Sequence, residues 1–64
     1  MLAIYTEKDG TVLKQNYDGL VAEAGEKGLS GYHATMTYLH DCYKHDESGF
    51  EGTFEQWLDA LKES

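Results

Sequence analysis

Residues 53–63, near the carboxyl end, carry the pattern that places the tightest limit on the fold. This stretch, TFEQWLDALKE, has apolar side chains three or four positions apart: Phe54, Trp57, Leu58 and Leu61. Such spacing is typical of one face of an α-helix. Thr53 is suited to cap the first turn, with Gln56 reaching back to it as in a capping box. We therefore predict a helix whose apolar face anchors the core.

The opposite side of this predicted helix is acidic. At about 100° per residue, Glu55, Asp59 and Glu63 lie on the arc facing away from the apolar side chains. Like charges four residues apart cost an isolated helix about 0.2–0.5 kcal/mol per pair. Four further acids precede the helix: Asp41, Asp46, Glu47 and Glu51. We predict that these acids together form a partner-binding surface.

The whole chain is acidic as well. Its 64 residues include 12 acids and 5 basic residues, for a formal net charge of −7. Nucleic-acid phosphates and anionic lipids repel such a surface, so the composition argues against direct binding to DNA, RNA or membranes. Long-range attraction favours a basic protein partner instead. The alternative explanation is that the charge only keeps a small protein in solution.

Length and cysteine content limit the organisation and the compartment. A chain this short supports a single core, so we expect one domain over residues 1–64. The lone Cys42 excludes an intramolecular disulfide, which suits a reducing cytosol. The first ten residues have no basic stretch and no long apolar run, so we expect neither a signal peptide nor a transmembrane segment. The expected location is cytoplasmic.

The amino-terminal residues predict a β-hairpin. Residues 2–6 and 11–17 favour strands, and residues 7–10 favour a turn in which Gly10 takes a positive φ. A four-residue loop pairs Ile4 with Leu13, whereas a two-residue Asp9-Gly10 turn pairs Ile4 with Gln15. We prefer the four-residue loop because it gathers the apolar residues on one face. The other face then carries Tyr5 and Val12, which we predict as a surface for homodimer formation.

Residues 18–52 complete the predicted order of elements. Asp18 is suited to cap a helix over residues 19–27, and Gly28 to end it. The segment YHATMTYL, residues 32–39, alternates like a strand, although as a helix it would align Tyr32 with Met36 and Leu39. Its threonines and tyrosines favour the strand. Residues 40–52 are polar and punctuated by glycine, which predicts a loop, with a short edge strand over residues 42–44 as a variant.

These elements together predict an α+β fold. The order is β-β-α-β-α, with a small, mainly antiparallel three-stranded sheet and the helices on one face.

The predicted loop contains the chain's only cluster of metal-ligating residue types: His40, Cys42 and His45. Imidazole and thiolate are zinc ligands, but this spacing matches no standard zinc signature, and short loops of this kind are usually solvated. We therefore expect no metal and no other cofactor. Cys42 beside a histidine also has the ingredients of a thiol nucleophile. The neighbouring acids Asp41 and Asp46 would raise its pKa, so we expect that the protein is not an enzyme.

In size, charge and predicted architecture the chain resembles the small acidic inhibitor proteins of phages and mobile elements, including anti-CRISPR proteins. No motif carries this resemblance, which makes it an analogy at the level of the fold. It implies a non-enzymatic inhibitor or adaptor that docks on a basic surface of a larger protein, including surfaces that bind nucleic acid. The alternative is a small homodimeric structural or regulatory module without an electrostatic target.

Overall fold

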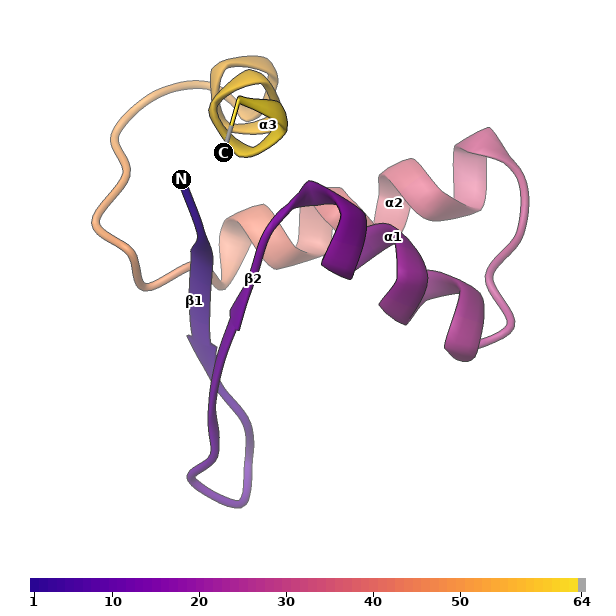
Figure 1. Ribbon diagram of the computed structural model, residues 1–64, viewed down its shortest axis with the longest axis horizontal. Coiled ribbons are helices and arrows are strands. Elements are labelled where there is room, and N and C mark those ends of the chain that lie inside the picture. Colours follow the sequence, from indigo (N-terminus) through magenta and orange to yellow (C-terminus); the bar gives the residue numbers. More distant parts are fainter. Residues whose placement is uncertain (64) are drawn as a thin grey trace.

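The computed structural model describes residues 1–63 and contains two strands followed by three helices. Strands β1 (Ala3–Thr6) and β2 (Val12–Gln15) pair as an antiparallel hairpin. The helices are α1 (Tyr17–Glu26), α2 (Tyr32–Lys44) and α3 (Phe54–Lys62). Figure 1 shows the loop end of the hairpin extending away from the helices, and α3 lying beside the amino terminus. None of the helices within residues 1–63 has the length and apolar character needed to cross a membrane.

The predicted third strand is wrong. Residues 32–39 form the first part of α2, so the protein is α+β with a two-stranded sheet and the order β-β-α-α-α. The buried residues of α2 are Leu39 and Cys42, and Met36 and Tyr43 pack against them at helical spacing. Tyr32, in the first turn of α2, is 81% exposed. Burial of this helical face outweighs the β propensity of the threonines and tyrosines.

The predicted loop over residues 40–52 is correspondingly shorter. Residues 40–44 continue α2, so the edge strand considered for residues 42–44 is also wrong. The threonines that favoured a strand are compatible with the helix. For example, the Thr37 hydroxyl donates a hydrogen bond to the His33 carbonyl oxygen one turn earlier, at 2.9 Å.

The hairpin adopts neither of the two predicted registers. Tyr5 pairs with Leu13 and Thr6 with Val12, a register one residue from each prediction. Beyond Thr6 and Val12, the Glu7 amide donates to the Thr11 carbonyl oxygen at 2.7 Å, which leaves a three-residue loop ending at Gly10 with φ +93°. Because side chains alternate between faces, this single step reverses the face that β1 buries. Ala3 is fully buried, whereas Ile4 on the opposite face is only half-buried.

The helix after the hairpin starts earlier than predicted. α1 begins at Tyr17, and its cap is the Asn16 side chain, which accepts a hydrogen bond from the Gly19 amide at 2.9 Å, rather than Asp18. Its end is as expected, because Gly28 has φ +78° just after the helix. The Leu29 amide donates to the Ala24 carbonyl oxygen at 3.0 Å, which completes a Schellman motif.

The core is one cluster of buried side chains contributed by β1 and all three helices. Trp57 of α3 is fully buried at its centre, with ring centroids of Tyr43 and Phe54 at 5.6 and 6.1 Å. The other fully buried large side chains are Leu20, Leu39 and Leu61. The apolar face predicted for residues 53–63 is therefore the anchor of the core.

Candidate functional site

Helix α3 presents the predicted acidic stripe to solvent. The Thr53 hydroxyl accepts a hydrogen bond from the Gln56 amide at 3.2 Å, and the Gln56 side chain accepts one from the Thr53 amide at 3.0 Å. This capping box fixes where the helix starts. Because Trp57, Leu58 and Leu61 are buried, the opposite arc faces outward, and its acids are exposed: Glu55, Asp59 and Glu63. Successive acids are separated by about 6 Å along the helix axis.

The acids on this surface have no cationic partner in the described part of the chain. The ion pairs within residues 1–63 are Lys27 with Glu23 and His45 with Asp41. Glu51, in the loop before α3, is exposed in the same way as the stripe. Lys62, the one lysine of α3, has its Nζ 5.2 Å from the centroid of the Tyr17 ring. The α3 acidic surface, which we define as Glu51, Glu55, Asp59 and Glu63, therefore has uncompensated negative charge.

Asp46 and Glu47 do not belong to the α3 acidic surface, because they form hydrogen bonds with the backbone at the outer edge of β1. The Ile4 amide donates to the Asp46 carboxylate at 2.8 Å, and the Glu47 amide donates to the Ile4 carbonyl oxygen at 2.5 Å. The Thr6 amide donates to the Glu47 carboxylate at 3.3 Å. These two residues therefore occupy the sheet edge where a third strand would have paired.

The Asp46 carboxylate also joins β1 to the core. It accepts hydrogen bonds from the Trp57 indole Nε1 at 2.8 Å, the Ser48 hydroxyl at 2.6 Å and the Ser48 amide at 3.1 Å. Partial burial by itself raises the pKa of Asp46, but the hydrogen bonds from Ser48, Ile4 and Trp57 outweigh it and hold the pKa below its ordinary value. The carboxylate thus stabilises the fold in its charged form.

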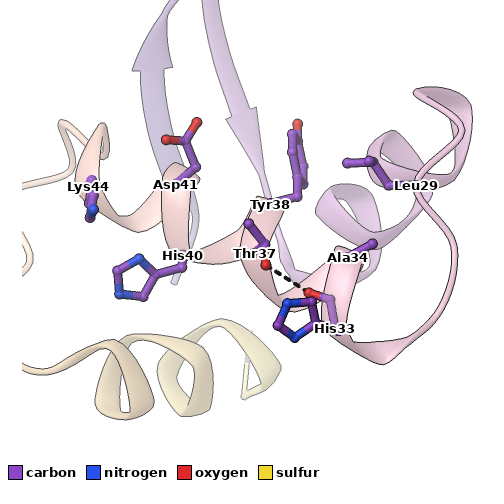
Figure 2. Close-up of a pocket in the computed structure, with 8 residues that line it drawn as sticks. All are labelled: Leu29, His33, Ala34, Thr37, Tyr38, His40, Asp41 and Lys44. Atoms are coloured by element: carbon purple, nitrogen blue, oxygen red, sulfur yellow. Dashed lines mark hydrogen bonds between the residues drawn. The ribbon is translucent and has the colours of Figure 1, made fainter.

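Asp41 lies apart from the α3 acidic surface. In Figure 2, Asp41 and His40 point to opposite sides of α2, and His40 points toward α3. The His40 ring is 4.9 Å from the Phe54 ring in an edge contact. Asp41 instead lies 3.7 Å from His45 Nδ1. The structure thus leaves four of the seven predicted acids exposed on α3 and in the loop before it, and places Asp41, Asp46 and Glu47 elsewhere.

The three residues considered as metal ligands do not converge: His40 and Cys42 lie in α2, and His45 follows its last residue. Cys42 is buried, whereas His40 and His45 are exposed, and the His45 ring is 2.9 Å from the Asp41 carbonyl oxygen. Within residues 1–63, no three side chains of histidine, cysteine, aspartate or glutamate are grouped so as to hold a metal ion.

Cys42 belongs to a cluster with Tyr5 and Tyr38 that the sequence did not indicate. Burial raises the pKa of the Cys42 thiol, only partly offset by its interactions with the two tyrosines. Burial, followed by the neighbouring thiol, also raises the pKa of both phenols. The Tyr5 hydroxyl is shielded from solvent, and no group within residues 1–63 is hydrogen-bonded to it at normal geometry. These groups are protonated at neutral pH, which does not favour nucleophilic chemistry.

The predicted dimer surface is divided between the two faces of the hairpin. Tyr5 faces α2, whereas Val12 is opposite Thr6 on the outer face and is 54% exposed. This separation is a direct consequence of the one-residue change in register.

An open hollow of about 830 Å³ runs along the outer side of α2. Figure 2 shows the residues that line it: Leu29, His33, Ala34, Thr37, Tyr38, His40, Asp41 and Lys44. The Thr37 hydroxyl donates a hydrogen bond to the His33 carbonyl oxygen, and within residues 1–63 no hydrogen bond joins two of the other side chains that line the hollow.

Comparison with protein-family models, curated proteins and solved structures finds no match to this chain.

Proposed function

We propose that the protein is a non-enzymatic binding module, an inhibitor or adaptor that docks its α3 acidic surface on a basic surface of a larger protein. The observation that supports this is the exposure of Glu55, Asp59 and Glu63 along one helix face, with Glu51 before them and no ion pair to any of the four within residues 1–63. Their like charges disfavour the isolated helix. A basic partner would neutralise these charges.

The mechanism is electrostatic. A row of carboxylates about one helical turn apart attracts lysine and arginine side chains, steers the encounter and fixes the orientation of the complex. Where the basic surface normally binds nucleic acid, the row of carboxylates competes with phosphate groups for the same side chains. Inhibition of a nucleic-acid-binding protein, as in phage anti-defence proteins, is the form of this function that we favour.

The test compares charge reversals on two surfaces. The double variant Glu55→Lys/Asp59→Lys reverses the α3 acidic surface, and Glu7→Lys/Glu26→Lys makes the same change in net charge at exposed positions elsewhere. Tagged forms of both variants and of the original protein capture partners from a lysate of the cells that produce it, at low and high salt.

We expect a captured protein that is lost at high salt and in the α3 variant but retained in the control variant. Equal capture by the two variants, or capture that salt does not weaken, contradicts the proposal.

A further inference from the structure

The two edges of the hairpin differ in how their backbone groups are satisfied. On β1, the outward-facing groups of Ile4 and Thr6 bind Asp46 and Glu47. In Figure 1, the loop that follows α2 passes beside β1, with β2 on the other side of the hairpin. One sheet edge is therefore covered by the chain itself.

The edge of β2 is free. Because Glu7 and Thr11 are hydrogen-bonded to each other, Tyr5 and Leu13 form the next hydrogen-bonded pair. The backbone N–H and C=O groups of Val12 and Lys14 therefore point away from β1. No hydrogen bond joins them to another segment within residues 1–63. A row of unpaired groups of this kind is a template for another strand.

We propose that this edge pairs with β2 of a second copy of the chain, giving a four-stranded antiparallel sheet across a two-fold axis. In the register we infer, Val12 of each copy lies opposite Lys14 of the other, and the two Leu13 residues face each other at the centre. The outward-pointing groups of Val12 and Lys14 then bind those of the other copy. A shift by two residues in one direction would place Lys14 opposite Lys14, which like-charge repulsion disfavours.

Charge favours the hairpin as the place where two such acidic chains meet. Residues 3–15 carry two acids and two lysines: Glu7, Asp9, Lys8 and Lys14. This balanced segment approaches its copy without the repulsion expected from a chain of net charge −7, whereas two α3 acidic surfaces would repel each other. Val12, 54% exposed on the outer face, gains contact with the stem of the opposing lysine.

The association is expected to be weak and dependent on concentration. One short strand from each copy contributes, so the buried area is below the ~1,200 Å² typical of stable complexes. This surface is distinct from the α3 acidic surface, so the dimer and the proposed function can each fail without the other.

The test uses sedimentation velocity from micromolar to millimolar concentration on three proteins. Val12→Lys places lysine opposite lysine and should weaken dimer formation about fivefold, even though it reduces the net negative charge. The double variant Val12→Lys/Lys14→Glu restores opposite charges across the interface and should recover the dimer, although its net charge is more negative than that of the original chain. Val12→Thr controls for loss of the valine itself.

Amide hydrogen exchange supplies a second readout that does not depend on a variant. The Val12 and Lys14 amides should exchange rapidly in dilute solution and become protected at millimolar concentration. The Leu13 amide, paired within the hairpin, should be protected at both. A protein that remains monomeric at millimolar concentration overturns the proposal, as does a dimer that persists unchanged in Val12→Lys.

Discussion

The indole Nε1 of Trp57 donates a hydrogen bond to the carboxylate of Asp46 at 2.8 Å. Through this contact the most deeply buried aromatic side chain of α3 is joined to a residue that also accepts a hydrogen bond from the Ile4 amide of β1. Asp46 thereby links the hairpin, the loop and the core. A tryptophan N–H that is buried requires a partner of this kind.

Replacement of Asp46 by alanine should destabilise the protein strongly. Asp46→Ala leaves the Trp57 indole and the Ile4 amide without acceptors, and each partly buried donor left unpaired costs about 1–3 kcal/mol. We expect a loss of about 2–4 kcal/mol in the free energy of unfolding. Urea unfolding followed by Trp57 fluorescence measures it. Asp59→Ala, at an exposed position, should change the value by less than about 0.5 kcal/mol. Equal stabilities of the two variants would contradict the role given to Asp46.

The Asp46 carboxylate should also make the stability of the protein depend on pH. The folded-state pKa of Asp46 lies below its ordinary value of 3.8. The ionised carboxylate therefore adds to the free energy of unfolding at pH values above 3.8, and this contribution is lost as the pH falls through the folded-state pKa. We expect the free energy of unfolding to decrease below about pH 4. In Asp46→Asn, which cannot ionise at this position, the decrease should be shallower. Chemical unfolding at a series of pH values compares the original protein with Asp46→Asn. If the free energy of unfolding falls equally steeply with pH in both, the Asp46 carboxylate does not make this contribution.

The features that the sequence predicted correctly are those determined by neighbouring residues. Residues 53–63 contain both the capping residues and the complete apolar face of α3, and Gly28 ends α1 through its own conformation. The stretch from 32 to 39 was wrongly predicted as a strand because alternation and β propensity are local, whereas the burial of Leu39 and Cys42 depends on distant segments. The predicted hairpin registers are wrong for a similar reason: the three-residue loop between Glu7 and Thr11 sets a register between those of the two- and four-residue loops.

The candidate surface was also only partly predictable. Exposure of Glu55, Asp59 and Glu63 follows from the helical period alone. Asp46 is indistinguishable from them by residue type, and its role depends on β1 lying beside it, 42 positions away in the chain. The one local sign in the sequence is Ser48, two positions after Asp46, a spacing at which an aspartate carboxylate accepts hydrogen bonds from the following residues. The Ser48 amide and hydroxyl make these bonds in the structure.

Cys42 should react slowly with thiol reagents in the folded protein. Its side chain is buried, and burial raises the pKa of the thiol, so both access and thiolate population are reduced. We expect labelling at neutral pH to be at least about tenfold slower than for the same protein unfolded in urea. The rate of labelling is measured from the absorbance of the group that the reagent releases. Labelling at equal rates in the folded and unfolded protein would show that the cluster with Tyr5 and Tyr38 does not shield the thiol.

Two glycines of the first helical region should respond to alanine in opposite directions. Gly25 lies within α1, is exposed, and has no atom within 4 Å of an added Cβ. Gly25→Ala should therefore raise the free energy of unfolding by about 0.5–1 kcal/mol, because alanine loses less conformational freedom in a helix. Thermal or urea unfolding measures the change.

Gly28 is equally open to an added side chain, but its φ of +78° is strained for alanine. Gly28→Ala should lower the free energy of unfolding by about 1 kcal/mol, as the Schellman motif that ends α1 is disturbed. The pair serves as its own control, because space around the two positions is the same and only the backbone conformation differs. If both substitutions raise the free energy of unfolding, α1 does not end at Gly28 in solution. A rise for Gly25→Ala and a fall for Gly28→Ala support the helix end described above.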